Sequence, residues 1–130
     1  MENNFLKVKT YLLELEYTIT KEDEKEGVLV IDRHENGINN MLLVCAEPIL
    51  IIEQHLFDMK KEDALIYKSL LMKNQDIIHG AFSLDESGKR VMFRDTLQLE
   101  NLDKNEIEGS LKSLELLLSE YSYKIIEFAK

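Results

Sequence analysis

The sequence predicts an α+β domain, in which an antiparallel β-sheet carries helices packed on one face. The stretch 79–103 (HGAFSLDESGKRVMFRDTLQLENLD) has the pattern of strand, tight turn, strand and helix cap. Upstream, apolar runs follow one another through short turns, which favours antiparallel neighbours. The expected order is α-β-β-β-α-β-β-α. No linker is long enough to divide the chain, so residues 1–130 are expected to form a single domain.

The first expected helix spans Phe5–Tyr17, and Asn3 or Asn4 can cap its start. Its apolar residues recur at helical spacing: Phe5, Val8, Leu12 and Leu15. The next ten residues, 18–27 (TITKEDEKEG), are polar and rich in charge and end in glycine. This composition predicts a solvated connection.

Three strands are expected next, at Val28–Ile31, Ile38–Ala46 and Ile49–Phe57. Asn36-Gly37 is a hairpin signal between the first two, because both residues tolerate positive φ. Pro48 marks the boundary before the third strand. Such uniformly apolar runs predict strands covered on much of both faces, by helices or by another subunit.

A second helix is expected after Asp58, which can act as its cap, with Glu62 and Asp63 in the first turn. Asn74-Gln75 ends it. Its apolar residues cover more than one face: Leu65, Ile66, Tyr67, Leu70, Leu71 and Met72. Such a helix is either deeply buried or shared between the core and an interface.

The last strand, Val91–Leu99, alternates apolar and polar residues, and only Asp95 interrupts its apolar face. Asp103 then caps the final helix, with Glu106 completing a capping box. Apolar residues repeat along that helix at alternating spacings of four and three: Ile107, Leu111, Leu114, Leu118, Tyr121, Ile125 and Phe128. This pattern predicts a helix lying on the sheet.

The charge balance argues against nucleic acid as a ligand. The chain has 16 basic and 25 acidic residues, a net charge of −9, whereas nucleic-acid binding depends on basic residues that neutralise phosphates. An anionic membrane surface is disfavoured for the same reason, and no apolar run approaches the roughly 20 residues that span a bilayer. The N-terminus lacks the pattern of a signal peptide, and a single cysteine fits a reducing compartment. We therefore expect a cytoplasmic protein without membrane insertion.

Residues suited to catalysis or metal binding are few: His34, His55, His79 and Cys45. Cys45 lies in an apolar strand, where a thiol usually acts as a small hydrophobic residue. The pairs Asp32/His34 and Glu53/His55 could meet across a hairpin as metal ligands, but exposed polar strand ends are the more ordinary interpretation. No nucleotide-binding or metalloprotease motif occurs. No catalytic, cofactor or metal residue is predicted, and we expect no enzyme activity.

A family resemblance centres on the second hairpin. It is carried by Gly80-Ala81-Phe82-Ser83-Leu84-Asp85, then Gly88 and Val91, then Leu97-Gln98-Leu99-Glu100 and Leu102-Asp103. These residues resemble the type III secretion chaperone-like superfamily, which comprises CesT/Tir-type chaperones and YbjN-like proteins. Leu70-Leu71 followed by Asn74 is similar to a YbjN-type helix end.

The resemblance implies a homodimer that holds other proteins instead of transforming a substrate. Partner segments would wrap as extended chain around the first helix and the sheet, through apolar pockets and strand addition. Candidate partner-binding residues are Phe5, Val8, Ile49 and Ile51. The second helix and second hairpin would form the dimer surface, with these candidates: Leu65, Ile66, Leu70 and Met72.

Two alternatives stay open at this point. One is a YbjN-like regulatory or adaptor protein without a secretion role. The other is a small enzyme or metal protein that uses the histidines or Cys45.

Overall fold

The computed structural model describes residues 3–130 and contains one six-stranded sheet in which every neighbouring pair of strands is antiparallel. The strand order is β1-β2-β3-β4-β6-β5. The elements are α1 (Asn4–Glu14), β1 (Thr18–Asp23), β2 (Val28–Arg33), the short 3-10 helix η1 (His34–Asn36), β3 (Ile38–Ala46), β4 (Ile49–Asp58), α2 (Ala64–Asn74), β5 (Ala81–Leu84), β6 (Arg90–Gln98) and α3 (Lys104–Phe128). The predicted α+β class is confirmed.

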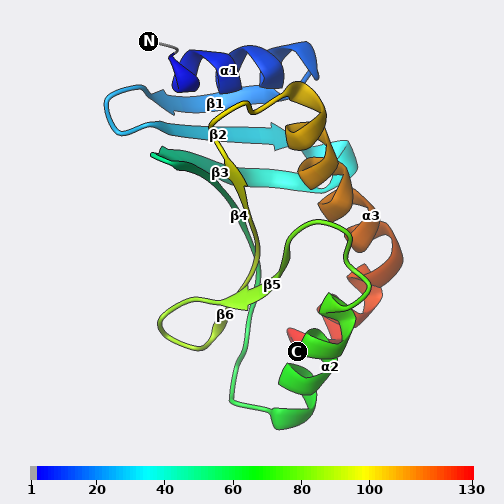
Figure 1. Cartoon of the computed structure of the whole chain (residues 1–130). Coiled ribbons are helices and arrows are strands. Elements are labelled where there is room, and N and C mark those ends of the chain that lie inside the picture. Colours follow the sequence, from blue (N-terminus) through cyan, green and yellow to red (C-terminus); the bar gives the residue numbers. More distant parts are fainter. Residues whose placement is uncertain (1–2) are drawn as a thin grey trace.

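One face of the sheet forms the core together with α1 and α3. Alternate strand residues are buried there, among them Leu29, Ile31, Met41, Leu43, Leu50, Ile52, Val91 and Phe93. Figure 1 shows α3 running along the molecule from α1 at one end to α2 at the other. Contacts agree with this path: Lys104 Nζ lies 3.2 Å from Glu14 Oε2 of α1, and Lys73 Nζ of α2 lies 5.1 Å from the centroid of the Tyr121 ring.

The predicted start of α3 is confirmed. The Asp103 carboxylate accepts from the backbone N–H of Glu106 at 2.9 Å, and the Glu106 carboxylate accepts from the backbone N–H of Asp103 at 3.2 Å. The helix then presents the expected apolar stripe to the core. Ile107, Leu111, Leu114 and Ile125 are buried, while Leu118, Tyr121 and Phe128 are partly buried against the same cluster.

Beyond the middle of β4, strands β3 and β4 no longer pair with each other. The ladder between β3 and β4 ends at the Leu42–Glu53 pair, whereas β4 continues beside β6 as far as Asp58. The buried Gln54 side chain bridges the opening: its Oε1 accepts from Asn39 N–H at 3.1 Å, and its Nε2 donates to the Gly37 carbonyl at 2.9 Å. Figure 1 shows β4 curving away from β1, β2 and β3.

Two predictions about the first half are wrong. The expected connection 18–27 contains β1, a polar strand that pairs with β2 through its backbone, so the chain has one strand more than expected. The first helix ends at Glu14 instead of Tyr17, because Glu16 adopts a left-handed conformation with φ of 67°. Asn3 is the cap, accepting from the Leu6 N–H at 3.1 Å.

The predicted start of the second helix is also wrong. Asp58 ends the ten-residue strand β4, and α2 begins only at Ala64. Its cap is Asp63, whose carboxylate accepts from the Leu65 N–H at 3.0 Å, so Glu62 and Asp63 precede the helix. The predicted end at Asn74-Gln75 is confirmed.

Candidate functional site

The second face of the sheet carries an apolar surface that is only half-buried. Buried and half-buried residues alternate along β2, in the middle of β3 and along the first part of β4, so the helices of this chain cover one face only. Cover of the second face by another subunit stays a prediction. We call this surface the open face; its residues are Val28, Val30, Leu42, Val44, Ile49 and Ile51. Val28 pairs with Val44, Val44 with Ile51, and Val30 with Leu42, which makes the surface continuous across three strands.

The predicted partner-binding residues fall into two groups. Ile49 and Ile51 lie on the open face, whereas Phe5 and Val8 lie on the inner side of α1 and are buried in the core. The four remaining open-face residues were not singled out from the sequence. Their period-two alternation with buried Leu29, Ile31 and Leu43 is the signal that would have found them.

A second apolar surface lies on α2. Leu65, Leu71 and Met72 are 75%, 71% and 64% exposed, respectively. Of the other predicted dimer residues, Ile66 is half-buried and Leu70 is buried in the core. The helix is therefore apolar on both its inner and its outer side, as its composition predicts.

An apolar pocket of about 190 Å³ lies between α2 and the β5–β6 hairpin, and of the three exposed residues Leu71 lines it. Its lining residues are Tyr67, Leu70, Leu71, Asn74, Phe82, Ser83, Leu84 and Val91. The amide of Asn74 fastens helix to hairpin, since its Oδ1 accepts from the Phe82 N–H at 2.7 Å and its Nδ2 donates to the Phe82 carbonyl at 3.3 Å. A protruding leucine and an apolar pocket thus lie side by side.

The residues suited to catalysis do not converge on one site. Within residues 3–130, no group of three histidine, cysteine, aspartate or glutamate side chains is arranged to hold a metal ion. Glu53 pairs with Arg94 at 3.0 Å, while His55 pairs with Asp58 at 2.7 Å. Burial raises the pKa of the Cys45 thiol to about 11, so this thiol is a poor nucleophile at neutral pH.

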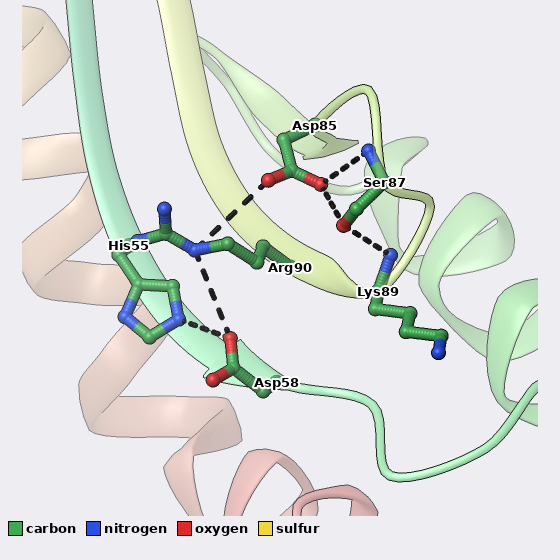
Figure 2. A network of polar contacts seen from close by, with 6 residues as sticks. All are labelled: His55, Asp58, Asp85, Ser87, Lys89 and Arg90. Carbon is green, nitrogen blue, oxygen red and sulfur yellow. Dashed lines mark hydrogen bonds and ion pairs between the residues drawn. The ribbon is translucent and has the colours of Figure 1, made fainter.

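A polar network fastens the β5–β6 turn to the end of β4 (Figure 2). Arg90 Nε lies 3.9 Å from the Asp58 carboxylate and 4.0 Å from that of Asp85. The Ser87 hydroxyl donates to Asp85 at 2.5 Å, and this hydrogen bond is the main cause of the lowered pKa of Asp85. The network holds the strand ends that flank the connection to α2, which gives it an ordinary structural role.

Comparisons with known proteins found a matching family and similar folds. The family model CesT_Tir_1 matches residues 1–130. The fold is similar to that of YbjN from E. coli, described as a candidate transcription regulator, with 9% identity, 90% of each chain covered and a TM-score of 0.68. It is also similar to a chain in the HopA1–SchA chaperone–effector complex, with 15% identity, 92% of this chain and 96% of that chain covered, and a TM-score of 0.63. No curated protein matches the sequence.

Both similarities agree with the resemblance carried by the second hairpin, and at these identities they establish the fold alone. The family is one of chaperone-like proteins, which points to a non-enzymatic role. In the described part of the chain, no helix has the length and apolar character needed to cross a membrane. The family match extends over the whole length, and the chain therefore belongs to the CesT_Tir_1 family.

Proposed function

We propose that this chain is a non-enzymatic protein-binding module that acts in the cytoplasm, without a cofactor, as a homodimer holding a segment of a partner protein. The observation that carries the proposal is the open face, where branched apolar side chains on three neighbouring strands stay half-buried. Contiguous apolar side chains that stay accessible on neighbouring strands are a feature of sites that bind other proteins. Apolar side chains of an extended partner segment would pack on Ile49, Ile51 and their neighbours.

The homodimer part of the proposal is supported by α2. In a two-fold interface the same patch occurs on both subunits, so a protruding group and the pocket that receives it must lie on one surface. Leu71, which is 71% exposed, lines the pocket between α2 and the β5–β6 hairpin and so supports such an arrangement. Leu65 and Met72 do not line the pocket and extend the apolar surface of the same helix. Phe5 and Val8, buried on the inner side of α1, would contribute by anchoring that helix to the core.

Affinity capture from native lysate tests the partner-binding function. The wild-type chain is compared with Ile51→Asp, which puts a charge in the open face, and with Asn105→Asp, which adds the same charge at the exposed start of α3. We expect the wild type and Asn105→Asp to capture the same protein, and Ile51→Asp to lose it. Capture that is equal for all three folded proteins would contradict the open face as the binding surface.

A second candidate function is that of a YbjN-like regulatory or adaptor protein without a secretion role. The fold similarity to YbjN, with a TM-score of 0.68 against 0.63 for the chaperone–effector complex, favours keeping it. The two candidates share the binding surface and differ in what binds. A captured secretion substrate supports the chaperone, whereas a captured regulatory protein supports the adaptor.

A further inference from the structure

A cleft of about 610 Å³ opens on the side of the sheet that faces α3, where β3 and β4 stop pairing with each other. Its lining residues come from η1, the start of β3, β4 and α3: Glu35, Asn36, Gly37, Asn39, Gln54, His55, Leu56, Glu115, Leu118, Ser119, Ser122 and Ile125. None of the residues that define the open face or protrude from α2 lines it, so the cleft is a separate surface. Volumes of roughly 300 to 1,000 Å³ are typical of sites that bind small molecules.

The cleft has two ends, because β4 and α3 run beside it in the same direction. At one level, the Gln54 side chain donates to the Gly37 carbonyl at 2.9 Å, and Gly37 packs so closely on α3 that a Cβ there would lie 2.7 Å from Leu118 Cδ1. Further along both elements, the ring of Phe57 lies 6.4 Å from that of Phe128. Residues later in β4 and later in α3 therefore share one end of the cleft.

The end that lies towards this aromatic contact is apolar. Leu56 and Ile125 line it, and each comes directly or shortly before one of the two aromatic residues in the sequence. Both side chains also belong to the hydrophobic cluster around the core, Ile125 as a buried member and Leu56 as a partly buried one. An apolar group that enters this end is removed from water against a preformed apolar wall.

The other end is acidic. Glu115 lies about one helical turn before Leu118, and its Oε1 accepts from the Tyr17 hydroxyl at 2.9 Å. The Arg33 guanidinium lies 5.2 Å from the centroid of the Tyr17 ring, and Arg33 Nε lies 3.7 Å from Glu35 Oε1. These contacts bring the two carboxylates that line the cleft to the same end. One guanidinium beside two carboxylates leaves one negative charge there, and no lysine or arginine lines the cleft.

We propose that this cleft binds a small organic cation that carries a single ammonium group on an apolar body, such as an alkylammonium ion. The ammonium group lies between the carboxylates of Glu35 and Glu115, where its hydrogen bonds are charge-assisted. The alkyl chain extends past Leu118 to Leu56 and Ile125. The net charge of −9 also favours the approach of a cation. Because the ligand is a small molecule, the inference goes beyond the proposed function and does not depend on it.

Titration calorimetry with the whole protein and four probes tests the ligand class. Hexylammonium is expected to bind. Hexanoate, which reverses the charge, and methylammonium, which lacks the chain, are each expected to bind at least about tenfold more weakly. No binding of hexylammonium, or equal affinity for either of these probes, would overturn the proposal. Nα-acetyl-lysine methylamide presents the same ammonium group as a protein side chain does, and tighter binding of this probe would overturn a free amine as the ligand.

Two pairs of variants on α3 test the two requirements separately. Glu115→Gln keeps the acceptor for Tyr17 and is expected to weaken hexylammonium binding about fivefold or more, whereas Glu120→Gln, at an exposed position outside the cleft, should change it less than twofold. Ser122→Trp fills the cleft from an exposed position and is expected to weaken binding about tenfold, whereas Tyr123→Trp lies outside the cleft and should bind as the wild type does. Equal effects within either pair would overturn the proposal.

Amide shifts in a ¹H–¹⁵N spectrum locate the probe. Shifts confined to residues 54–56 and 115–125 support the cleft. Shifts centred on Val30 and Val44 would overturn it in favour of the open face, and shifts centred on Leu71 and Leu84 would overturn it in favour of the pocket beside α2. Capture of a partner protein through Ile51 uses no residue of the cleft, so failure of the amine to bind leaves the proposed function standing.

Discussion

At the scale of single residues, Asp95 illustrates how a polar group is accommodated on an apolar face. It interrupts the inward-facing residues of β6, and a carboxylate left there without a donor would be costly. The hydroxyl of Ser110, fully buried on α3, donates to Asp95 Oδ2. The interruption seen in the sequence is therefore a hydrogen-bonded contact between helix and sheet.

Ser110→Ala is expected to lower the free energy of unfolding by about 1 to 3 kcal/mol, because it removes the donor to the Asp95 carboxylate. Ser119→Ala on the same helix is the control. The Ser119 hydroxyl donates only to the Leu116 carbonyl at an exposed position, so its loss should cost about 0.5 kcal/mol or less. Urea denaturation measures both changes, and equal values for the two variants would contradict the assigned role of Ser110.

Cys45 gives a prediction that depends on pH. Its pKa is raised from 9.0 to about 11, mainly by burial, so the thiolate is scarce in the folded protein at pH 8. Alkylation by iodoacetamide should therefore be about tenfold or more slower in the native protein than in urea. The neutral thiol contributes stability that is complete below pH 9 and is lost as the pH rises towards 11. Native and unfolded rates that coincide at pH 8 would count against shielding of this half-buried thiol by the fold.

At the scale of elements, α2 shows how two acidic residues compete to start a helix. Asp58 and Asp63 are both suitable caps, and the apolar run up to Phe57 suggests that the helix follows directly. Instead, Asp58 stays in β4 because the β4–β6 ladder extends to the Asp58–Arg90 pair. The helix then starts at the later candidate, Asp63.

Substitutions at Asp63 and Asp58 test which of the two residues caps α2. Asp63→Ala is expected to destabilise the protein by about 0.5 to 2 kcal/mol, because the Leu65 N–H loses its acceptor. Asp63→Asn retains an acceptor oxygen and should stay close to the wild type. The corresponding Asp58→Ala removes only exposed contacts to His55 and Arg90 and should cost about 1 kcal/mol or less. Thermal unfolding followed by circular dichroism ranks the three variants by stability. A larger loss of stability in Asp58→Ala than in Asp63→Ala would contradict the assignment of Asp63 as the helix cap.

The strand β1 belongs to the same scale. Its six residues, TITKED, include one apolar side chain, and most of them are exposed. They form a strand because β2 offers its backbone edge, with pairs running from Thr18–Asp32 to Asp23–Val28. Hydrogen bonds between backbones leave little trace in side-chain composition, so a polar edge strand resembles a loop in the sequence.

At the scale of the whole molecule, the sheet consists of two parts. Strands β1, β2 and β3 form the part that carries most of the open face, while β4 continues with β6 and β5 towards α2. Figure 1 shows this second part extending away from α1. The apolar surface proposed for a partner lies on the sheet and the one proposed for a second copy lies on α2, which allows both to be occupied at once.

The dimer is tested by charge insertion on α2. We expect wild-type protein to elute at twice the chain mass of 15.2 kDa in size-exclusion chromatography with light scattering. The double variant Leu65→Glu, Leu71→Glu is expected to elute as a monomer, because two buried carboxylates per subunit would disfavour the interface. Leu6→Glu, Leu13→Glu places the same charges on exposed positions of α1 and should remain a dimer. A wild type that is monomeric at micromolar concentration would contradict the homodimer.

Local patterns in the sequence predict the fold class, all eight expected elements in outline, the α3 cap and the family, and they miss only the additional strand β1. These features rest on local signals: period-two strands, a capping box and an apolar stripe at helical spacing. The sequence also indicates that α2 carries more apolar surface than one face requires, which the exposure of Leu65 and Met72 agrees with.

Which apolar residues remain at a surface depends on tertiary contacts. Phe5, Val8, Ile49 and Ile51 are all apolar, yet the first two are buried and the last two lie on the open face. The divergence of β3 from β4 and the cleft beside it likewise depend on where a ladder stops. The physical reason is the same in each case: burial and strand pairing are set by contacts between segments distant in the chain, whereas composition and spacing report only each segment's own preferences.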